Sequence, residues 1–177
     1  MYDEDEDTLD AIIHLGMADG WEWFSLEERA FHADFKCDWW GPTEESVGYY
    51  RIPDDAGKTV EDIGKEEGKD LWKDMPMGIA TYLSVPRIAS KVAAAVNAPN
   101  ESGKDKLEVG VYAHFDPGSY GCGFIYYESL ATCKKREYQT KVLFVHVPGW
   151  KDAERLSRGR DVVCAVAGAI CQQVSRF

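Results

Sequence analysis

The feature that most constrains the fold of this chain is the alternation of helical and extended segments along its C-terminal half. Apolar residues in segments 84–99 and 158–174 recur with the spacing of amphipathic helices. Segments 106–115 and 141–147 are instead alternating or rich in β-branched residues, which is typical of strands. Strands that alternate with helices form a largely parallel sheet covered on its faces. We therefore predict an α/β fold, a three-layer sandwich with a twisted, largely parallel central sheet and helices on both faces.

The N-terminal half is less regular. Residues 11–20 form an apolar run that ends at glycine, as a buried strand followed by a loop would. Residues 38–74 are rich in Gly, Pro and charge and are predicted to form a long irregular excursion. Residues 1–9 are predicted to be an acidic tail. Because 177 residues show no internal repeat or boundary, we expect a single domain spanning residues 1–177.

Charge and cysteine usage narrow the classes of partner. The net charge of −11 argues against nucleic acid or an anionic membrane, because both repel an acidic surface. No apolar run is long enough to span a bilayer, and the N-terminus has no signal-peptide core. Five dispersed cysteines without a C-x-x-C pair suggest a reducing compartment. We expect a cytoplasmic protein, and the sequence sets no oligomeric state.

Cys122 stands between two glycines, where a predicted strand gives way to a helix predicted from residue 122 to residue 133. The N–H groups and dipole at a helix start stabilise a thiolate and lower the pKa of the thiol. Cys122 is therefore a candidate nucleophile on a sharp strand-to-helix turn. The alternative is a small apolar residue buried under that turn.

His146 lies at the end of the strand predicted for residues 141–147. If the strands before Cys122 and through His146 are parallel neighbours, their C-terminal ends meet at one sheet edge. A histidine there can take the thiol proton and hold a thiolate–imidazolium pair. A third group must orient the imidazole, and Glu27 and Glu28 are both candidates that spacing does not separate. The alternative is a buried histidine bonded to backbone.

The remaining histidines suggest no metal site. His14 lies in the apolar run and is expected to be a core residue, and His32 and His114 lack metal-ligand spacing with any cysteine or carboxylate. We therefore predict no metal ligands.

Four segments, taken in order, resemble the pyroglutamyl peptidase I (pyrrolidone carboxyl peptidase) family. The segment around Cys122 is similar to the family's cysteine segment, and the step of 24 residues from Cys122 to His146 matches the family's spacing. The resemblance covers residues 10 to about 174. The four segments are LGMADG with SLEER (15–20, 25–29), RIPDDAG (51–57), DPGSYGCGFIYYESL (116–130) and FVHVP (144–148).

The resemblance implies an activity and a set of roles. Members of the family remove an N-terminal pyroglutamate (5-oxoproline) from peptides through a Cys-His-Glu triad, without metal or organic cofactor. It implies that Cys122 is the nucleophile and His146 the base, and it selects Glu27 over Glu28. It further implies an oxyanion-binding role for Arg51. Gly16 and Met17 are implied to belong to the substrate-binding loop.

The sequence also departs from the family pattern. Members open with a strand carrying a G-F-G-P-F loop, a helix and a second strand, whereas this chain begins directly before AIIHLG. Gly123 replaces the usual Asn or Asp, Met17 replaces a Gln of bacterial members, and an insertion precedes Arg51. Two alternatives follow: a truncated or degenerate, non-catalytic relative, or another Cys–His acyl-transfer enzyme such as a glutamine amidotransferase.

Overall fold

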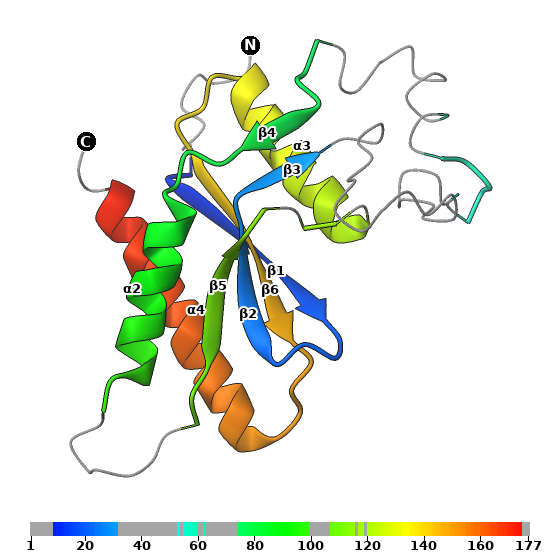
Figure 1. The fold of residues 1–177 in the computed structure, drawn as a ribbon. Helices are drawn as coiled ribbons and strands as arrows, with labels where there is room; N and C mark the ends of the chain where they lie inside the picture. Colours follow the sequence, from blue (N-terminus) through cyan, green and yellow to red (C-terminus); the bar gives the residue numbers. More distant parts are fainter. Residues whose placement is uncertain are drawn as a thin grey trace.

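The computed structural model describes most of the predicted strands and helices (Figure 1). The described residues are 9–31, 53, 55–59, 62, 74–99, 107–115, 117–118 and 120–174. Most of the predicted acidic tail and most of the predicted excursion over residues 38–74 lie outside them. Arg51 and His32 also lie outside the described residues.

A four-stranded sheet forms the centre of the molecule, in the order β1-β6-β2-β5 (Figure 1). The strands are β1 (Ala11–Ala18), β2 (Trp23–Glu27), β5 (Gly110–His114) and β6 (Lys141–Pro148). β1 pairs in parallel with β6, and β2 pairs in parallel with β5. β2 and β6 pair in the antiparallel direction at the centre of the sheet. The sheet is therefore largely parallel, as predicted.

The expectation that the strand before Cys122 and the strand of His146 are parallel neighbours is wrong. β2 lies between β5 and β6 and runs opposite to β6. The connection over residues 19–22 explains the direction of β2, since the roughly dozen residues of a parallel crossover do not fit into it and β2 must run opposite to β1. The chain turns back there, with the Trp21 amide donating to the Ala18 carbonyl at 3.3 Å. The parallel neighbour of β6, the strand of His146, is β1, and the carboxyl ends of these two strands share an edge.

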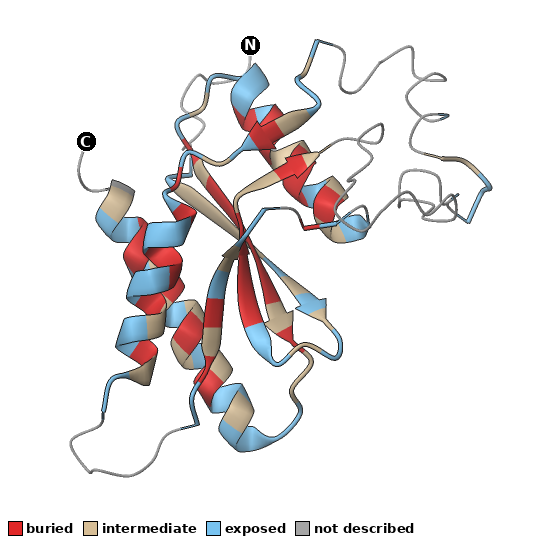
Figure 2. Ribbon diagram, in the orientation of Figure 1, coloured by how far each residue is buried: buried red, intermediate tan, exposed pale blue. Residues whose placement is uncertain are grey.

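Helices α2 (Val85–Asn97) and α4 (Ala153–Val174) cover one face of the sheet (Figure 1). Their buried sides meet alternate sheet residues in one apolar cluster, and Figure 2 shows the buried bands facing inward. The largest members are Phe24, Leu26, Ile88, Leu143 and Ile170.

Arg158 joins this layer at its edge. Its guanidinium is buried and donates to the Val96 carbonyl at 2.8 Å and the Leu107 carbonyl at 3.1 Å. These bonds tie α4 to the end of α2 and to the segment before β5.

Helix α3 (Gly121–Lys135) covers the other face together with a two-stranded sheet of β3 (Arg29–Phe31) and β4 (Gly78–Ala80). Tyr126 and Tyr127 are fully buried in this layer. Because a buried phenol needs a partner, each hydroxyl donates to a carbonyl, that of Glu27 at 2.9 Å and that of Pro76 at 2.6 Å. The predicted three-layer arrangement, with helices on both faces, is confirmed.

Each predicted helix and strand is present among the described residues, but some begin or end at other residues than predicted. α4 begins at Ala153, five residues before the predicted start at Arg158. The Asp152 carboxylate accepts the Arg155 amide at 2.8 Å and so caps a first turn that carries few apolar residues. Within the described residues, none of the helices has the length and apolar content that a transmembrane segment requires.

Candidate active site

The predicted nucleophile lies against the carboxyl ends of β1 and β6. Cys122 is the second residue of α3, and its sulfur lies beside Gly16 of β1. Gly16 is the register partner of His146 on β6. The sulfur of Cys122 and the imidazole of His146 therefore both lie near the carboxyl ends of β1 and β6, which we call the corner of the sheet. A Cβ on Gly16 would lie 2.9 Å from Cys122 Sγ and 2.5 Å from Phe144 Cζ. The glycine leaves the space that the sulfur occupies.

Replacing Gly16 by alanine should therefore destabilise the protein. The added methyl meets the Phe144 ring, which is buried and held in the core, and the sulfur of Cys122. We expect a loss of about 1–3 kcal/mol in the free energy of unfolding, measured by urea denaturation. Gly168→Ala is the matched control, because a Cβ there meets nothing within 4 Å on helix α4. That control should gain up to about 1 kcal/mol, and equal midpoints for the two variants would contradict the packing argument.

Glu27 is the last residue of β2 and is fully buried. The antiparallel register pairs Ser25 with His146, and Glu27, two residues on, faces the same side of the sheet. Nδ1 of His146 lies 2.9 Å from Oε1 of Glu27. Since an ionised carboxylate only accepts, Nδ1 carries the proton and Nε2 is left as the acceptor in the neutral ring. The structure thus brings Glu27 to His146.

Glu28, the rival of Glu27 in the sequence, takes part in the backbone instead. Its amide donates to the carbonyl of His114 at 2.7 Å. The residue continues the chain from β2 toward β3, and strand alternation directs its side chain away from the face that carries His146.

A second imidazole, which the sequence did not suggest for the site, bonds to the other oxygen of Glu27. Nδ1 of His114 lies 3.0 Å from Oε2. The sequence signal for it was its position at the end of the strand predicted for residues 106–115. That position alone does not predict a contact with Glu27, because the contact depends on β5 being the neighbour of β2 in the sheet.

The hydrogen bonds to Glu27 keep it ionised. Burial raises the pKa of this carboxyl, but the hydrogen bonds from His114, His146 and Ser25, together with the charge of His114, outweigh burial and hold the pKa below its ordinary value. A buried carboxylate with two imidazole N–H donors is therefore the stable form, and it can stabilise positive charge on either ring.

The thiol of Cys122 is not preformed as a thiolate. Burial raises its pKa, and the negative charge of Glu27 raises it further. The backbone N–H of Cys122 acts in the opposite direction but is outweighed, so the lowering expected from the helix start does not prevail. The sulfur therefore needs a base to remove its proton.

Comparisons with known proteins address the fold. No protein-family model and no curated protein sequence matches this chain. A solved structure of pyrrolidone carboxyl peptidase from Pyrococcus furiosus matches with a TM-score of 0.61 and 20% identity, over 93% of this chain and 70% of that one. The enzyme from Thermococcus litoralis matches with a TM-score of 0.62 and 17% identity, over 94% and 68%. This chain has the pyrrolidone carboxyl peptidase fold.

The resemblance inferred from four short segments is thus confirmed for the fold. In this pyrrolidone carboxyl peptidase fold, Met17 does not join the other predicted site residues through its side chain. It is 66% exposed, and alternation along β1 directs it to the face opposite Gly16, near Gly149. The position of Arg51 lies outside the described residues.

Aromatic rings that the sequence did not single out surround His146. The Phe144 ring lies 4.9 Å from the imidazole, and the Trp21 ring lies 5.5 Å from it. Trp21, in the turn after β1, is stacked on Trp23 at 5.1 Å. These rings limit the motion of the imidazole and give the site an apolar wall.

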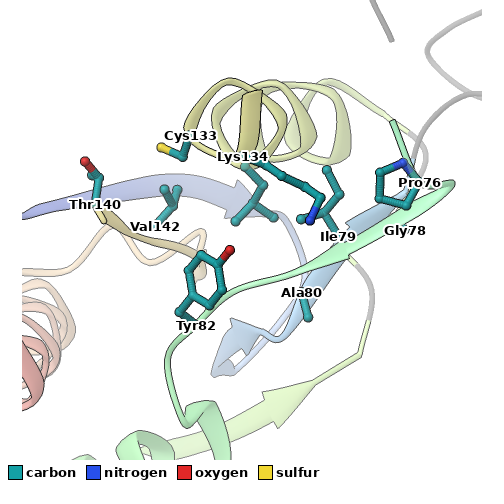
Figure 3. A pocket seen from close by; sticks show the side chains of 10 residues that line it. Pro76, Gly78, Ile79, Ala80, Tyr82, Cys133, Lys134, Thr140 and Val142 are labelled. Carbon is teal, nitrogen blue, oxygen red and sulfur yellow. The ribbon is translucent and has the colours of Figure 1, made fainter. Parts of the chain in front are cut away.

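A cavity of about 170 Å³ lies beneath the C-terminal half of α3, away from Cys122 at the helix start (Figure 3). None of the predicted site residues lines it. Its lining residues are Pro76, Gly78, Ile79, Ala80, Tyr82, Leu130, Cys133, Lys134, Thr140 and Val142. Among the described residues, no group of three His, Cys, Asp or Glu side chains is arranged to hold a metal ion.

Proposed function

We propose that this protein is a cysteine peptidase that removes an N-terminal pyroglutamate from peptides. The observation that carries the proposal is the buried Glu27–His146 hydrogen bond, beside which Cys122 lies in the first turn of α3. A carboxylate, an imidazole and a thiol in this order are the parts of a nucleophilic acyl-transfer site. The substrate class comes from the pyrrolidone carboxyl peptidase fold and from the resemblance of the four segments.

The first step is proton transfer and attack. Nε2 of His146 accepts the proton of Cys122 Sγ, and the negative charge of Glu27 stabilises the imidazolium that results. The sulfur forms a bond to the carbonyl carbon of the pyroglutamyl residue, and the π pair moves to the oxygen. Backbone N–H groups in the first turn of α3, with Arg51, would hold that oxyanion. No acidic side chain of the first turn of α3 opposes the negative charge.

In the later steps His146 first donates a proton and then accepts one. His146 gives its proton to the departing amine as the C–N bond breaks, which leaves a pyroglutamyl thioester on Cys122. It then takes a proton from water, whose oxygen attacks the thioester carbonyl. Collapse releases pyroglutamate and returns the proton to the sulfur. Neither metal nor organic cofactor enters these steps.

The test is hydrolysis by the purified full chain, with reductant present, of a fluorogenic amide linked to pyroglutamate. The matched comparison substrate is the prolyl amide, which has the ring but lacks its lactam carbonyl. We expect release of the fluorophore from the pyroglutamyl substrate alone. Release of ammonia from glutamine would point instead to amidotransferase chemistry, and silence toward every substrate from a folded chain would favour a non-catalytic relative.

A further inference from the structure

Two imidazoles share the carboxylate of Glu27. His146 bonds to Oε1 at 2.9 Å, and His114 bonds to Oε2 at 3.0 Å. The arrangement follows from the sheet, because β2 lies between β5 and β6. The register places Glu27 directly beside His114 on β5, while Ser25, on the same face, lies opposite His146 on β6.

The two imidazoles differ in their access to water. The side chain of His114 is 53% exposed, whereas that of His146 is 9% exposed and Glu27 between them is fully buried. His114 can therefore exchange protons with solvent directly. A single carboxylate charge stabilises one imidazolium well and two poorly, so protonation of one ring opposes protonation of the other.

We propose that His114 is a positioning residue that acts through Glu27 and sets the pH at which His146 takes up a proton. When His114 is neutral, the full charge of Glu27 supports an imidazolium at His146. When His114 is protonated, it offsets that charge and makes the thiolate–imidazolium pair less favourable. The catalytic consequence rests on the proposed function, whereas the coupling between the rings does not.

Three ionisable groups beside the two rings have shifted pKa values in the described part of the chain. Burial raises the pKa of Tyr126 and of Cys122, and the histidine bonds lower that of Glu27. All three shifts lead away from the range of pH 5–8 in which imidazole ordinarily titrates. Within the described residues, the ionisable groups around His114 and Glu27 are Tyr112 on β5, Glu28 and Arg29 after β2, Cys122 and Tyr126 on α3, and His146 on β6.

The test follows the ring protons of His146 by NMR across pH 5–9 in the full chain, labelled at histidine. In the wild-type protein the His146 signal should show two inflections, one of which coincides with the titration of His114. In His114→Gln, whose amide can still donate to Glu27 but cannot become charged, that inflection should vanish. The pKa of His146 should then rise by about one unit. A single His146 inflection that His114→Gln leaves in place would overturn the proposal.

His14→Gln is the matched control. His14 lies on the same face of the sheet, but its Nε2 is bonded to Ser129 Oγ at 2.8 Å rather than to Glu27. The His146 titration should be unchanged in this variant. A shift equal to that in His114→Gln would show a general effect of altering this face and would overturn the specific coupling.

Kinetics separate this proposal from the proposed function. For an active enzyme, the acid limb of kcat/KM should move to higher pH by about one unit in His114→Gln, because the undivided charge of Glu27 then keeps His146, the base, protonated up to a higher pH. An acid limb that stays in place while hydrolysis continues would contradict the role of His114. If the wild-type chain hydrolyses no pyroglutamyl amide, the proposed function fails, and the NMR titration still decides the coupling.

Discussion

Replacing Cys122 by alanine is expected to reduce kcat/KM for a pyroglutamyl amide at least about 10³-fold, because no acyl-enzyme can form. The neighbouring parts of the site remain, since the sulfur lies beside Gly16 at the start of α3 and supports no strand pairing. Stopped hydrolysis assays with active-site titration would give kcat/KM, and circular dichroism would show that the variant is folded.

Cys164→Ser is the control for this experiment. Cys164 is exposed on α4, which covers the sheet face opposite to α3. Its replacement should leave kcat/KM within about twofold, because surface substitutions away from a site cost little. Hydrolysis by Cys122→Ala at the wild-type rate would show that another group is the nucleophile.

The helices and several of the strands were predictable because they carry patterns of their own, whereas the strands β2, β3 and β4 were not predicted. The apolar residues of α2 recur at helical spacing, and β6 is a run of β-branched and aromatic residues that is buried along most of its length. The order of the strands was harder to predict, because periodicity says nothing about which strand pairs with which. The short connection over residues 19–22 was the usable signal, since it forces β2 to run opposite to β1.

The chemistry-bearing residues of the site were predictable in part. Cys122 stands between two glycines at the start of α3, and His146 stands two residues before Pro148, the end of β6. The structure places both where β1 and β6 end. Glu27 was separable from Glu28 through the resemblance alone. In the structure, strand alternation separates them, because it places Glu27 on the face of His146.

The contacts around that core were not predictable from local patterns. His114 reaches Glu27 because β5 and β2 are neighbours, and Trp21 reaches His146 across the turn between β1 and β2. Both contacts join segments that are far apart in the sequence. A histidine or a tryptophan in a sequence is as compatible with ordinary packing as with a place in the site, so the residue type alone predicts neither contact.

Glu27→Gln is the substitution expected to have the second largest effect on activity. The amide keeps the shape of the carboxyl but places an N–H donor opposite Nδ1 of one of its two histidines. Where that ring is His146, its proton must move to Nε2, which then cannot accept the thiol proton. We expect kcat/KM to fall by about 10²–10⁴-fold, and Glu28→Gln, the adjacent control, to stay within about twofold. Equal losses in both variants would contradict the role given to Glu27.

The pH dependence of stability supplies an independent readout of the same carboxylate. Burial raises the pKa of Glu27, but the hydrogen bonds from His114, His146 and Ser25 and the charge of His114 together hold that pKa below its ordinary value of 4.5 in the folded state. Its contribution is therefore fully present above about pH 4.5 and is lost as the pH falls through the lower folded pKa. The difference in unfolding free energy between wild type and Glu27→Gln, measured in urea, should be about 2–4 kcal/mol at pH 7. This difference in unfolding free energy should be smaller at pH 3. If it is the same at pH 3 and pH 7, the ionised form of Glu27 does not hold the two imidazoles.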